Sequence, residues 1–527
     1  MTDKSVFDQP QAASLTHDEM PADFTAITSD RSFFGQPRGL ATLFFTEMWE
    51  RFSYYGIRPL LVLFMTAAFA SGGFNFSRES ASAIVGIYAA SVYLSSLPGG
   101  WVADRWLGLQ RAIWYGGVFI ALGHLCIALS ILFSEKAFFT GLVLIVIGTG
   151  LLKPNISAMV GDLYPQPGPR RDAGFSIFYM GINFGALLAP LITSPLGEKV
   201  GWHLGFGVAG LGMLVGLIMF RIRSGPTLGA LGTQVAGDAA SQARVRMIAI
   251  GLAVLVGLAV LLGNLGVYTL NPVALASNVR NIILASAALY FTYLFGFAGL
   301  TRDEKKGMVV IVVLFMGSIV FWSAYEQAPT SLTLFARDFT DRHIFGFELP
   351  AGTLQSTPAI FVVVFAPVFA AIWATLGKRD IVPSFPAKFS FALVAAGLGF
   401  FVMVGAANKV ITGGGVGIKV SMWWLVLSYF LQVLGELALS PVGLSAMTTL
   451  APRRFVGQMM GVWFTSISLG NLIAGIVGGN VDPEKLNEMP ALFQRTAMSL
   501  FIGAVVLAAL SFPIRKMMDR RSGTIGR

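Results

Sequence analysis

The feature that most constrains this chain is a succession of long apolar segments that fills most of its length. Each has about 20 to 30 residues, enough for a helix to cross the roughly 30 Å hydrocarbon core of a bilayer. Backbone groups immersed in lipid must pair within their own segment, which favours helices. The sequence thus predicts an all-α polytopic membrane protein with fourteen transmembrane helices, at residues 39–66, 80–106, 111–133, 137–163, 171–195, 202–220, 246–268, 278–300, 307–335, 352–376, 385–407, 422–450, 455–479 and 492–514.

The charges of the chain indicate how these helices are oriented. Of 527 residues only 12% are charged, against about 25% in soluble domains. The net charge is +10, but a nucleic-acid partner would require the cations on one folded face, and none is expected. The cations instead recur in alternate loops, which by the positive-inside rule predicts that both termini are cytoplasmic; examples are Arg105, Arg111, Arg170, Arg171, Arg221, Arg223, Arg302, Lys305, Lys378, Arg379, Arg453 and Arg454.

Several kinds of chemistry find no support in the sequence. Cys126 is the single cysteine and there are four scattered histidines, so neither a disulfide nor a metal site is predicted. No nucleophile elbow or phosphate loop is found, and we expect neither an enzyme nor a cofactor. The polar N-terminal stretch has no apolar h-region, so no cleavable signal peptide is expected.

The spans fall into two groups of six around an inserted pair. We expect a mobile cytoplasmic tail at residues 1–38, a six-helix bundle at 39–223, a second bundle at 306–516 and a tail at 517–527. Residues 224–305 are predicted to be a connector that carries two peripheral helices, beginning with a flexible stretch rich in Gly, Ala and Ser. Two six-helix halves are typical of the major facilitator superfamily.

The first apolar segment contains a cluster of ionisable residues. Glu47, Glu50 and Arg51 are three or four residues apart, as are Arg51 and Tyr55, so these side chains share one face of a helix. Each charge in a bilayer costs roughly 2.5 to 3.5 kcal/mol or more. The cluster therefore indicates a polar cavity or ion pathway, the alternative being a buried ion-pair staple between helices.

Further intramembrane charges are divided between the two halves. Arg58 and Lys153 are cations of the first half, and Glu326 and Glu436 are acids of the second. A zwitterion held between the halves would place its carboxylate toward Arg51 and Lys153 and its ammonium toward Glu436. The remaining predicted substrate contacts supply hydroxyl, amide and aromatic surfaces, with ordinary helix packing as the alternative; they are Tyr54, Tyr55, Tyr93, Asn183, Trp322 and Trp463.

Five motifs extend over nearly the whole chain. EMWERFSYYG at residues 47–56 resembles the ExxERFxYYG motif of the proton-dependent oligopeptide transporter family, with every specified position met. The other four are GLLKPNIS at 150–157, FYMGINFG at 178–185, FWSAYEQ at 321–327 and GELALSP at 435–441. In addition, GGWVADRWLGLQR at 99–111 is similar to the loop motif of the major facilitator superfamily, and the two-helix insert is similar to that of the family's bacterial branch.

This resemblance implies a proton-coupled importer of di- and tripeptides, a functional monomer in a bacterial inner membrane, with protons as the coupling ion. Proton coupling is expected to involve Glu47, Glu50, Arg51 and Lys153, with Glu326 as a second proton site. Protonation of the acids would release the cations to bind the peptide carboxylate. An outer gate is predicted between Arg58 and Asp338 as the two halves rock against each other.

The chain departs from the family pattern at two positions. Gly86 stands where animal members have a histidine, and Pro358 where an asparagine is usual. Neither change affects the first-helix cluster. The alternative function is a transporter of nitrate or another small organic anion, but a substrate without an ammonium group needs no acid such as Glu436. A membrane sensor that does not transport would tolerate loss of the coupling residues, which are intact here.

Overall fold

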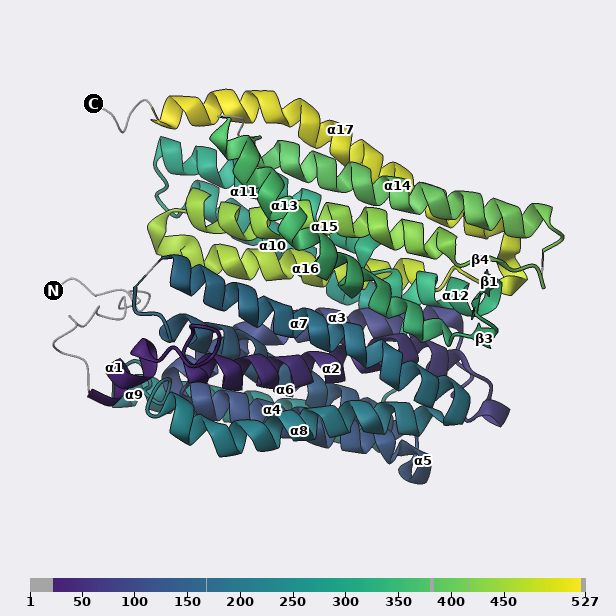
Figure 1. The fold of residues 1–527 in the computed structure, drawn as a ribbon, viewed down its shortest axis with the longest axis horizontal. Coiled ribbons are helices and arrows are strands. Elements are labelled where there is room, and N and C mark those ends of the chain that lie inside the picture. Colours follow the sequence, from purple (N-terminus) through teal and green to yellow (C-terminus); the bar gives the residue numbers. More distant parts are fainter. Residues whose placement is uncertain (1–21, 167, 380–382, 416, 523–527) are drawn as a thin grey trace.

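The structure, a computed structural model, describes residues 22–166, 168–379, 383–415 and 417–522. Its long helices form two bundles, which occupy the lower and upper halves of Figure 1. The first bundle consists of α2 (Arg38–Thr66), α3 (Arg78–Val102), α4 (Leu109–Ala128), α6 (Glu135–Asp162), α7 (Pro169–Pro195) and α8 (Trp202–Leu228). The second consists of α11 (Arg302–Tyr325), α13 (Thr357–Lys378), α14 (Phe385–Thr412), α15 (Trp423–Leu450), α16 (Val456–Gly478) and α17 (Met489–Ser522).

The inserted pair is α9 (Ala239–Asn264) and α10 (Pro272–Gly296), which brings the long helices of the described ranges to fourteen. Thirteen are apolar enough to span a membrane by length and composition. The remaining one is α2, whose 29 residues include the predicted charged cluster. The all-α fold with fourteen spanning helices is therefore confirmed.

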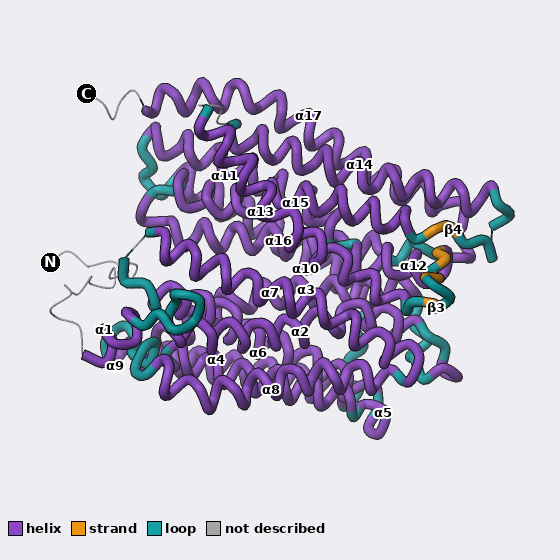
Figure 2. Tube along the Cα trace, viewed as in Figure 1, coloured by secondary structure: helices purple, strands orange, loops and turns teal. Residues whose placement is uncertain are grey.

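The two ends of the molecule differ. The short α1 (Ala22–Ser29) and the last turns of α17 lie at one end, here named the terminal face (Figure 1). Figure 2 shows strands only at the opposite end, the loop face. There β1 (Thr340–Asp341) pairs in parallel with β4 (Val420–Ser421), and β2 (His343–Ile344) forms an antiparallel hairpin with β3 (Phe347–Glu348). The remaining short helices are α5 (Ser130–Phe133) and α12 (Thr333–Phe339).

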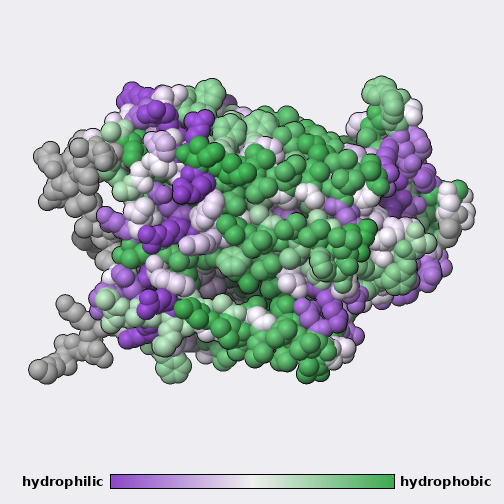
Figure 3. Space-filling model, turned by 90° about the horizontal axis from the view of Figure 1, so that it is seen from below, coloured by the Kyte–Doolittle hydropathy of each residue, from purple (hydrophilic) through white to green (hydrophobic). Residues whose placement is uncertain are grey.

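The surface fits a bilayer. In Figure 3 apolar residues form a broad band, and hydrophilic residues gather toward the two ends. The inserted helices add to this band: of the 26 residues of α9 only Val245 is buried, while Leu252, Leu255 and Leu258 are exposed. Such a helix gains its stability from lipid rather than from a protein core, in keeping with the predicted peripheral position of the pair.

The N-terminal segment corrects one expectation. Residues 1–21 lie outside the described part, but 22–38 are folded against the first bundle, not mobile. Arg170 donates hydrogen bonds to the carbonyls of Thr28 (2.9 Å) and Asp30 (2.5 Å). Burial acts to raise the pKa of Asp30, but hydrogen bonds from Arg38 and Ser32 outweigh it and lower this pKa to about 2. The Asp30 carboxylate thus stays ionised at any physiological pH.

The connector is also more ordered than its composition suggests. The helix predicted to end at residue 220 continues to Leu228, and the loop 229–238 is bound to the turn between α3 and α4. Gln110 donates to the carbonyls of Gly229 (2.9 Å) and Leu231 (2.6 Å), and the amide of Ala236 donates to the carbonyl of Asp104 (2.6 Å). The motif at 99–111 therefore holds the connector in place.

The bundles meet most closely where α3 crosses α16. An ideal Cβ added at Gly86 would lie 2.8 Å from the Cα of Gly475 and 2.8 Å from the carbonyl oxygen of Asn471. Since both contacts are with backbone, only glycine allows this crossing, and a histidine has no room here. The absence of the histidine found in animal members therefore has a packing reason in this chain.

The crossing gives a first prediction. Gly86→Ala should destabilise the protein by about 1 to 3 kcal/mol through overpacking, seen as a lower thermal unfolding midpoint in detergent. Gly257→Ala is the matched control, because this α9 glycine has nothing within 4 Å of its added Cβ. Equal midpoints for the two variants would contradict the assigned packing role of Gly86.

Candidate functional site

The centre of the site is the charged cluster of α2. Glu47, Glu50 and Arg51 are 2%, 0% and 3% exposed. Arg51 Nε lies 3.1 Å from Glu47 Oε1 and 2.5 Å from Glu50 Oε2. The close approach of α7 covers the cluster, since a Cβ at Gly185 would lie 2.8 Å from Arg51 Cβ. The ion pairs thus form within one helix, not between helices as the staple interpretation required.

Lys153 of α6 supplies a second cation beside this cluster. Its ammonium lies 4.1 Å from the ring centroid of Tyr93, and no carboxylate of the described residues comes within 4.0 Å of it. The acids that act on Lys153 from farther away are Glu50, Glu47 and Glu326. A half-buried lysine held only by an aromatic face remains available to an incoming anion.

The acids of the second bundle have different partners. Glu326, at the C-terminal end of α11, forms an ion pair with Arg58 of α2 across the bundle interface. Glu436 of α15 accepts a hydrogen bond from the Tyr325 hydroxyl, and no basic side chain of the described residues pairs with it. Glu436 is half-buried. Glu436 lies on the second bundle, and its carboxylate could bind a positive group.

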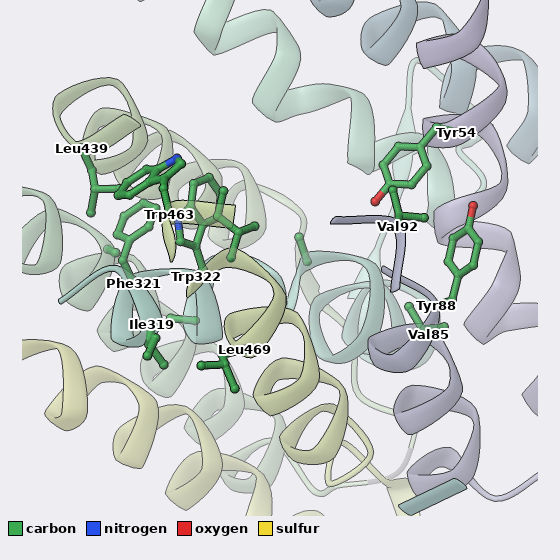
Figure 4. Close-up of a cluster of buried hydrophobic side chains, with 14 of the residues drawn as sticks. Tyr54, Val85, Tyr88, Val92, Ile319, Phe321, Trp322, Leu439, Trp463 and Leu469 are labelled. Atoms are coloured by element: carbon green, nitrogen blue, oxygen red, sulfur yellow. The ribbon is translucent and has the colours of Figure 1, made fainter. Parts of the chain in front are cut away.

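The predicted aromatic contacts separate into two groups. Tyr55 and Tyr93 are half-buried beside the charges, whereas Tyr54 is buried between the Arg51 and Arg58 guanidiniums, 5.2 and 5.3 Å from its ring centroid. Figure 4 shows Trp322 and Trp463 beside Phe321 and Leu439, across from Tyr54 and Tyr88. Trp463 is buried against the Phe389 ring, so packing in the second bundle explains it.

Asn183 was predicted to offer its amide to a substrate. In the structure its side-chain nitrogen donates to the carbonyl of Tyr179 one turn earlier, at 2.9 Å. Tyr179 itself is exposed and lies near enough to Glu436 for this carboxylate to act on its hydroxyl. Asn183 remains a predicted substrate contact, and Tyr179 is a further exposed polar group of this region.

The predicted ion pair between Arg58 and Asp338 is wrong, because each residue has a different partner in the structure. Arg58 does not reach Asp338, because Glu326 lies closer across the interface and takes its guanidinium. Asp338 instead pairs with Arg78 of α3 at 2.6 Å and with the neighbouring Arg337 at 2.8 Å. Both predicted residues lie at the bundle interface, but the sequence offered no means of choosing between Arg58 and Arg78.

The interface is closed toward the loop face. Arg78 also donates to the carbonyl of Val481 (2.9 Å), and Lys485 pairs with Glu79 (3.0 Å). Among the described residues, the polar contacts between bundles lie from the middle of the molecule to the loop face; they are Arg58–Glu326, Arg78–Asp338, Arg78–Asp482, Arg78–Val481, Glu79–Lys485, Thr66–Arg337, Ala90–Ser468, Leu187–Ser356, Glu198–Ala351, Glu198–Gly352 and Lys199–Glu348.

Toward the terminal face, the structure shows no polar contact between the bundles among the described residues. Ser157 lies four residues after Lys153, on the same face of α6, and is exposed. Leu444 lies eight residues after Glu436 on α15 and is exposed as well. The polar contacts between the bundles therefore lie on the loop-face side of the site, and exposed side chains follow Lys153 and Glu436 toward the terminal face.

Three site residues were missed from the sequence. Tyr179 and Tyr325 lie inside the recognised motifs at 178–185 and 321–327, so their positions were usable signals. Arg78 is the first residue of α3, and a charged residue at the end of a membrane helix is too common to indicate a functional site. No group of three or more His, Cys, Asp or Glu side chains that could hold a metal is found in the described part.

Comparisons with known proteins agree on one family. The sequence profile of the POT family matches residues 110–489. Peptide transporter YePEPT of Yersinia enterocolitica is 50% identical over 506 residues, covering 95% of this chain and 98% of that protein. The di-/tripeptide transporter of Lactococcus lactis subsp. lactis is 38% identical, with coverage of 93% and 98%.

Solved structures give the same result. A crystal structure of a mutant peptide transporter POT in complex with alafosfalin has a TM-score of 0.85 at 40% identity, covering 94% of this chain and 98% of that one. A POT family transporter in complex with 5-aminolevulinic acid has a TM-score of 0.83 at 34% identity, with coverage of 93% and 99%.

The pair across the interface yields a second prediction. Arg58→Met or Glu326→Met alone should each destabilise by about 3 to 5 kcal/mol, because the other charge is left buried and unpaired, while the double variant should recover much of the loss. Unfolding of the purified protein in detergent measures this cycle. The exposed pair Glu79–Lys485 is the control and should show little coupling. Additive losses at Arg58 and Glu326 would contradict their pairing.

Proposed function

This chain belongs to the POT family, and from that premise we propose that it is a proton-coupled symporter that imports di- and tripeptides. Relatives named as peptide transporters are similar to it over almost its whole length. The observation that carries the proposal is the separation of charge in the site. Lys153 of the first bundle lacks an ion-pair partner among the described residues, and Glu436 of the second is paired only with a hydroxyl.

A short peptide in its zwitterionic form matches this arrangement. Its carboxylate would bind Lys153, supported by Arg51, and its ammonium would bind Glu436. Tyr55, Tyr93 and Tyr179 would contact the backbone and side chains of the peptide. Because the first bundle would bind the carboxylate of the peptide and the second bundle its ammonium, a bound peptide would draw the bundles together.

Proton coupling would follow from the α2 cluster. Glu47 and Glu50 share Arg51, so two carboxylates face one guanidinium. Protonation of one acid would weaken its hold on Arg51 and on Lys153, which frees positive charge for the peptide carboxylate. Glu326 is the second proton site, since its protonation would release Arg58 and loosen the interface. The membrane potential would supply about 2.3 kcal/mol per charge per 100 mV.

The direction of transport rests on the topology. We place the protein in a bacterial inner membrane with the terminal face in the cytoplasm, as the distribution of basic loops predicts. The polar contacts between the bundles, which among the described residues lie from the middle of the molecule to the loop face, support an inward-open state. A single chain contains both bundles and every proposed site residue, so a monomer would suffice for transport. No cofactor takes part in this scheme, and the lipid contact is the apolar band of Figure 3.

The main scheme gives a third prediction. Proteoliposomes with an imposed proton gradient should accumulate labelled dialanine, and Glu50→Gln or Lys153→Ala should reduce driven uptake about tenfold or more. Lys388→Ala is the matched control, since Lys388 also lies over an aromatic ring, 4.6 Å from the Trp373 centroid, but outside the site. Accumulation without a gradient, or full driven uptake by both site variants, would refute the mechanism.

A fourth prediction separates peptides from simple anions. Excess tripeptide should compete with labelled dialanine, whereas nitrate and free alanine should not. Glu436→Gln should weaken peptide binding about tenfold or more, because the ammonium loses a charged partner. Binding to the detergent-purified protein measures both effects. Competition by nitrate that Glu436→Gln leaves unchanged would favour the organic-anion alternative.

A further inference from the structure

A half-buried acid outside the site described so far also joins the two bundles. Glu198 lies in the π-helical turn η3 (Leu196–Val200), which continues α7 at the loop face. Its carboxylate accepts hydrogen bonds from the backbone amides of Ala351 and Gly352, each at 2.8 Å. These amides begin η5 (Ala351–Ser356), the 3-10 helix that leads directly into α13 of the second bundle.

Glu198 supplies hydrogen-bond acceptors that the second bundle does not provide for the first amides of η5. The first amides of a helix have no partner within the helix and are usually satisfied by a side chain just before it. Here the residue before η5 is Pro350, which offers no side-chain acceptor. Glu198 reaches over from the first bundle and provides one carboxylate oxygen to each amide. Hydrogen bonds to an ionised acceptor are stronger than those between neutral groups.

Neighbouring contacts hold the same segment. The Ser356 hydroxyl donates to the carbonyl of Leu187 (2.8 Å), and Lys199 donates to the carbonyl of Glu348 (2.5 Å). A Cβ added at Gly352 would overlap the hydroxyl of Ser194, so η5 lies directly against α7. The charged groups that act on Glu198 from the packed elements are Arg342 and Arg337.

The two hydrogen bonds from the amides of Ala351 and Gly352 to Glu198, here named the clamp, are separate from the ion pairs already described. Arg58–Glu326 and Arg78–Asp338 join α2 and α3 to α11 and α12. Glu198 joins α7 to η5 and hence to α13. An opening at the loop face that separates α7 from α13 must break both of its hydrogen bonds at once.

We propose that Glu198 is a further gate residue of the transport cycle, which holds the loop face closed by capping η5 and releases it when the bundles part. The inference rests on the proposed function only for its role in transport. The clamp itself is a property of the closed conformation and can be measured without a substrate. Loss of the clamp should raise the outward-open population.

The test is a pair of spin labels across the loop face. Phe69 and Phe345 are 72% and 97% exposed, one on each bundle, and are replaced by cysteine in a Cys126→Ala background. Electron–electron double resonance on the reconstituted protein gives the distance distribution. In Glu198→Gln the ratio of the long-distance to the short-distance population should rise roughly tenfold. Glu135→Gln, an exposed acid at the first turn of α6, should leave it unchanged.

A second variant tests the same contact from the other side. Ala351→Pro removes one donor, and proline is tolerated at the first position of a helix. It should shift the distribution in the same direction even if Glu198→Gln proves unstable. Distributions equal to those of the parent in both variants would overturn the proposal. Failure of the labelled parent to take up dialanine would instead refute the proposed function, whatever the distances show.

Discussion

The constraint on which the rest of this structure depends is the cost of charge in a low-dielectric environment. Glu47, Glu50 and Arg51 alone leave one negative charge in α2, and Lys153 of α6 supplies the balancing positive charge. Arg58 and Glu326 balance each other across the interface. Among the described residues Glu436 has no basic partner, and the Tyr325 hydroxyl offsets only part of the cost of its burial. In the proposed mechanism a proton or a substrate ammonium would complete that balance, which would couple binding to the electrostatics of the site.

The fold makes this balance conditional on conformation. Lys153 and Glu436 lie on helices of different bundles, so the proposed rocking would change their separation, whereas the α2 cluster would move as one unit. The glycine crossing of α3 and α16 keeps the bundles in contact at the middle. Around that contact the loop face is closed by ion pairs and backbone contacts.

The helices and the α2 cluster could be predicted from the sequence, because both depend on residues close together in the chain. Fourteen apolar segments fix the helices, and spacings of three and four residues place Glu47, Glu50 and Arg51 together. Contacts between bundles were less accessible, because they depend on packing rather than on spacing. Arg58 and Asp338 were both correctly located at the interface but wrongly paired, and Trp463 is buried in the second bundle. The connector reads as flexible from its composition, and only the structure shows its hydrogen bonds to the turn between α3 and α4.

The position of Lys153 over Tyr93 has a consequence for affinity. A cation over an aromatic ring is held by about 0.5 to 2 kcal/mol, whereas separating a buried ion pair costs several. In the proposed binding mode, a peptide carboxylate that binds Lys153 would lose little binding free energy in displacing the contact with Tyr93. Since each 1.4 kcal/mol changes a dissociation constant tenfold, a lysine locked to Glu47 or Glu50 would weaken peptide binding by orders of magnitude. The contact with Tyr93 holds the Lys153 ammonium in position without the large loss of peptide affinity that an ion pair would cause.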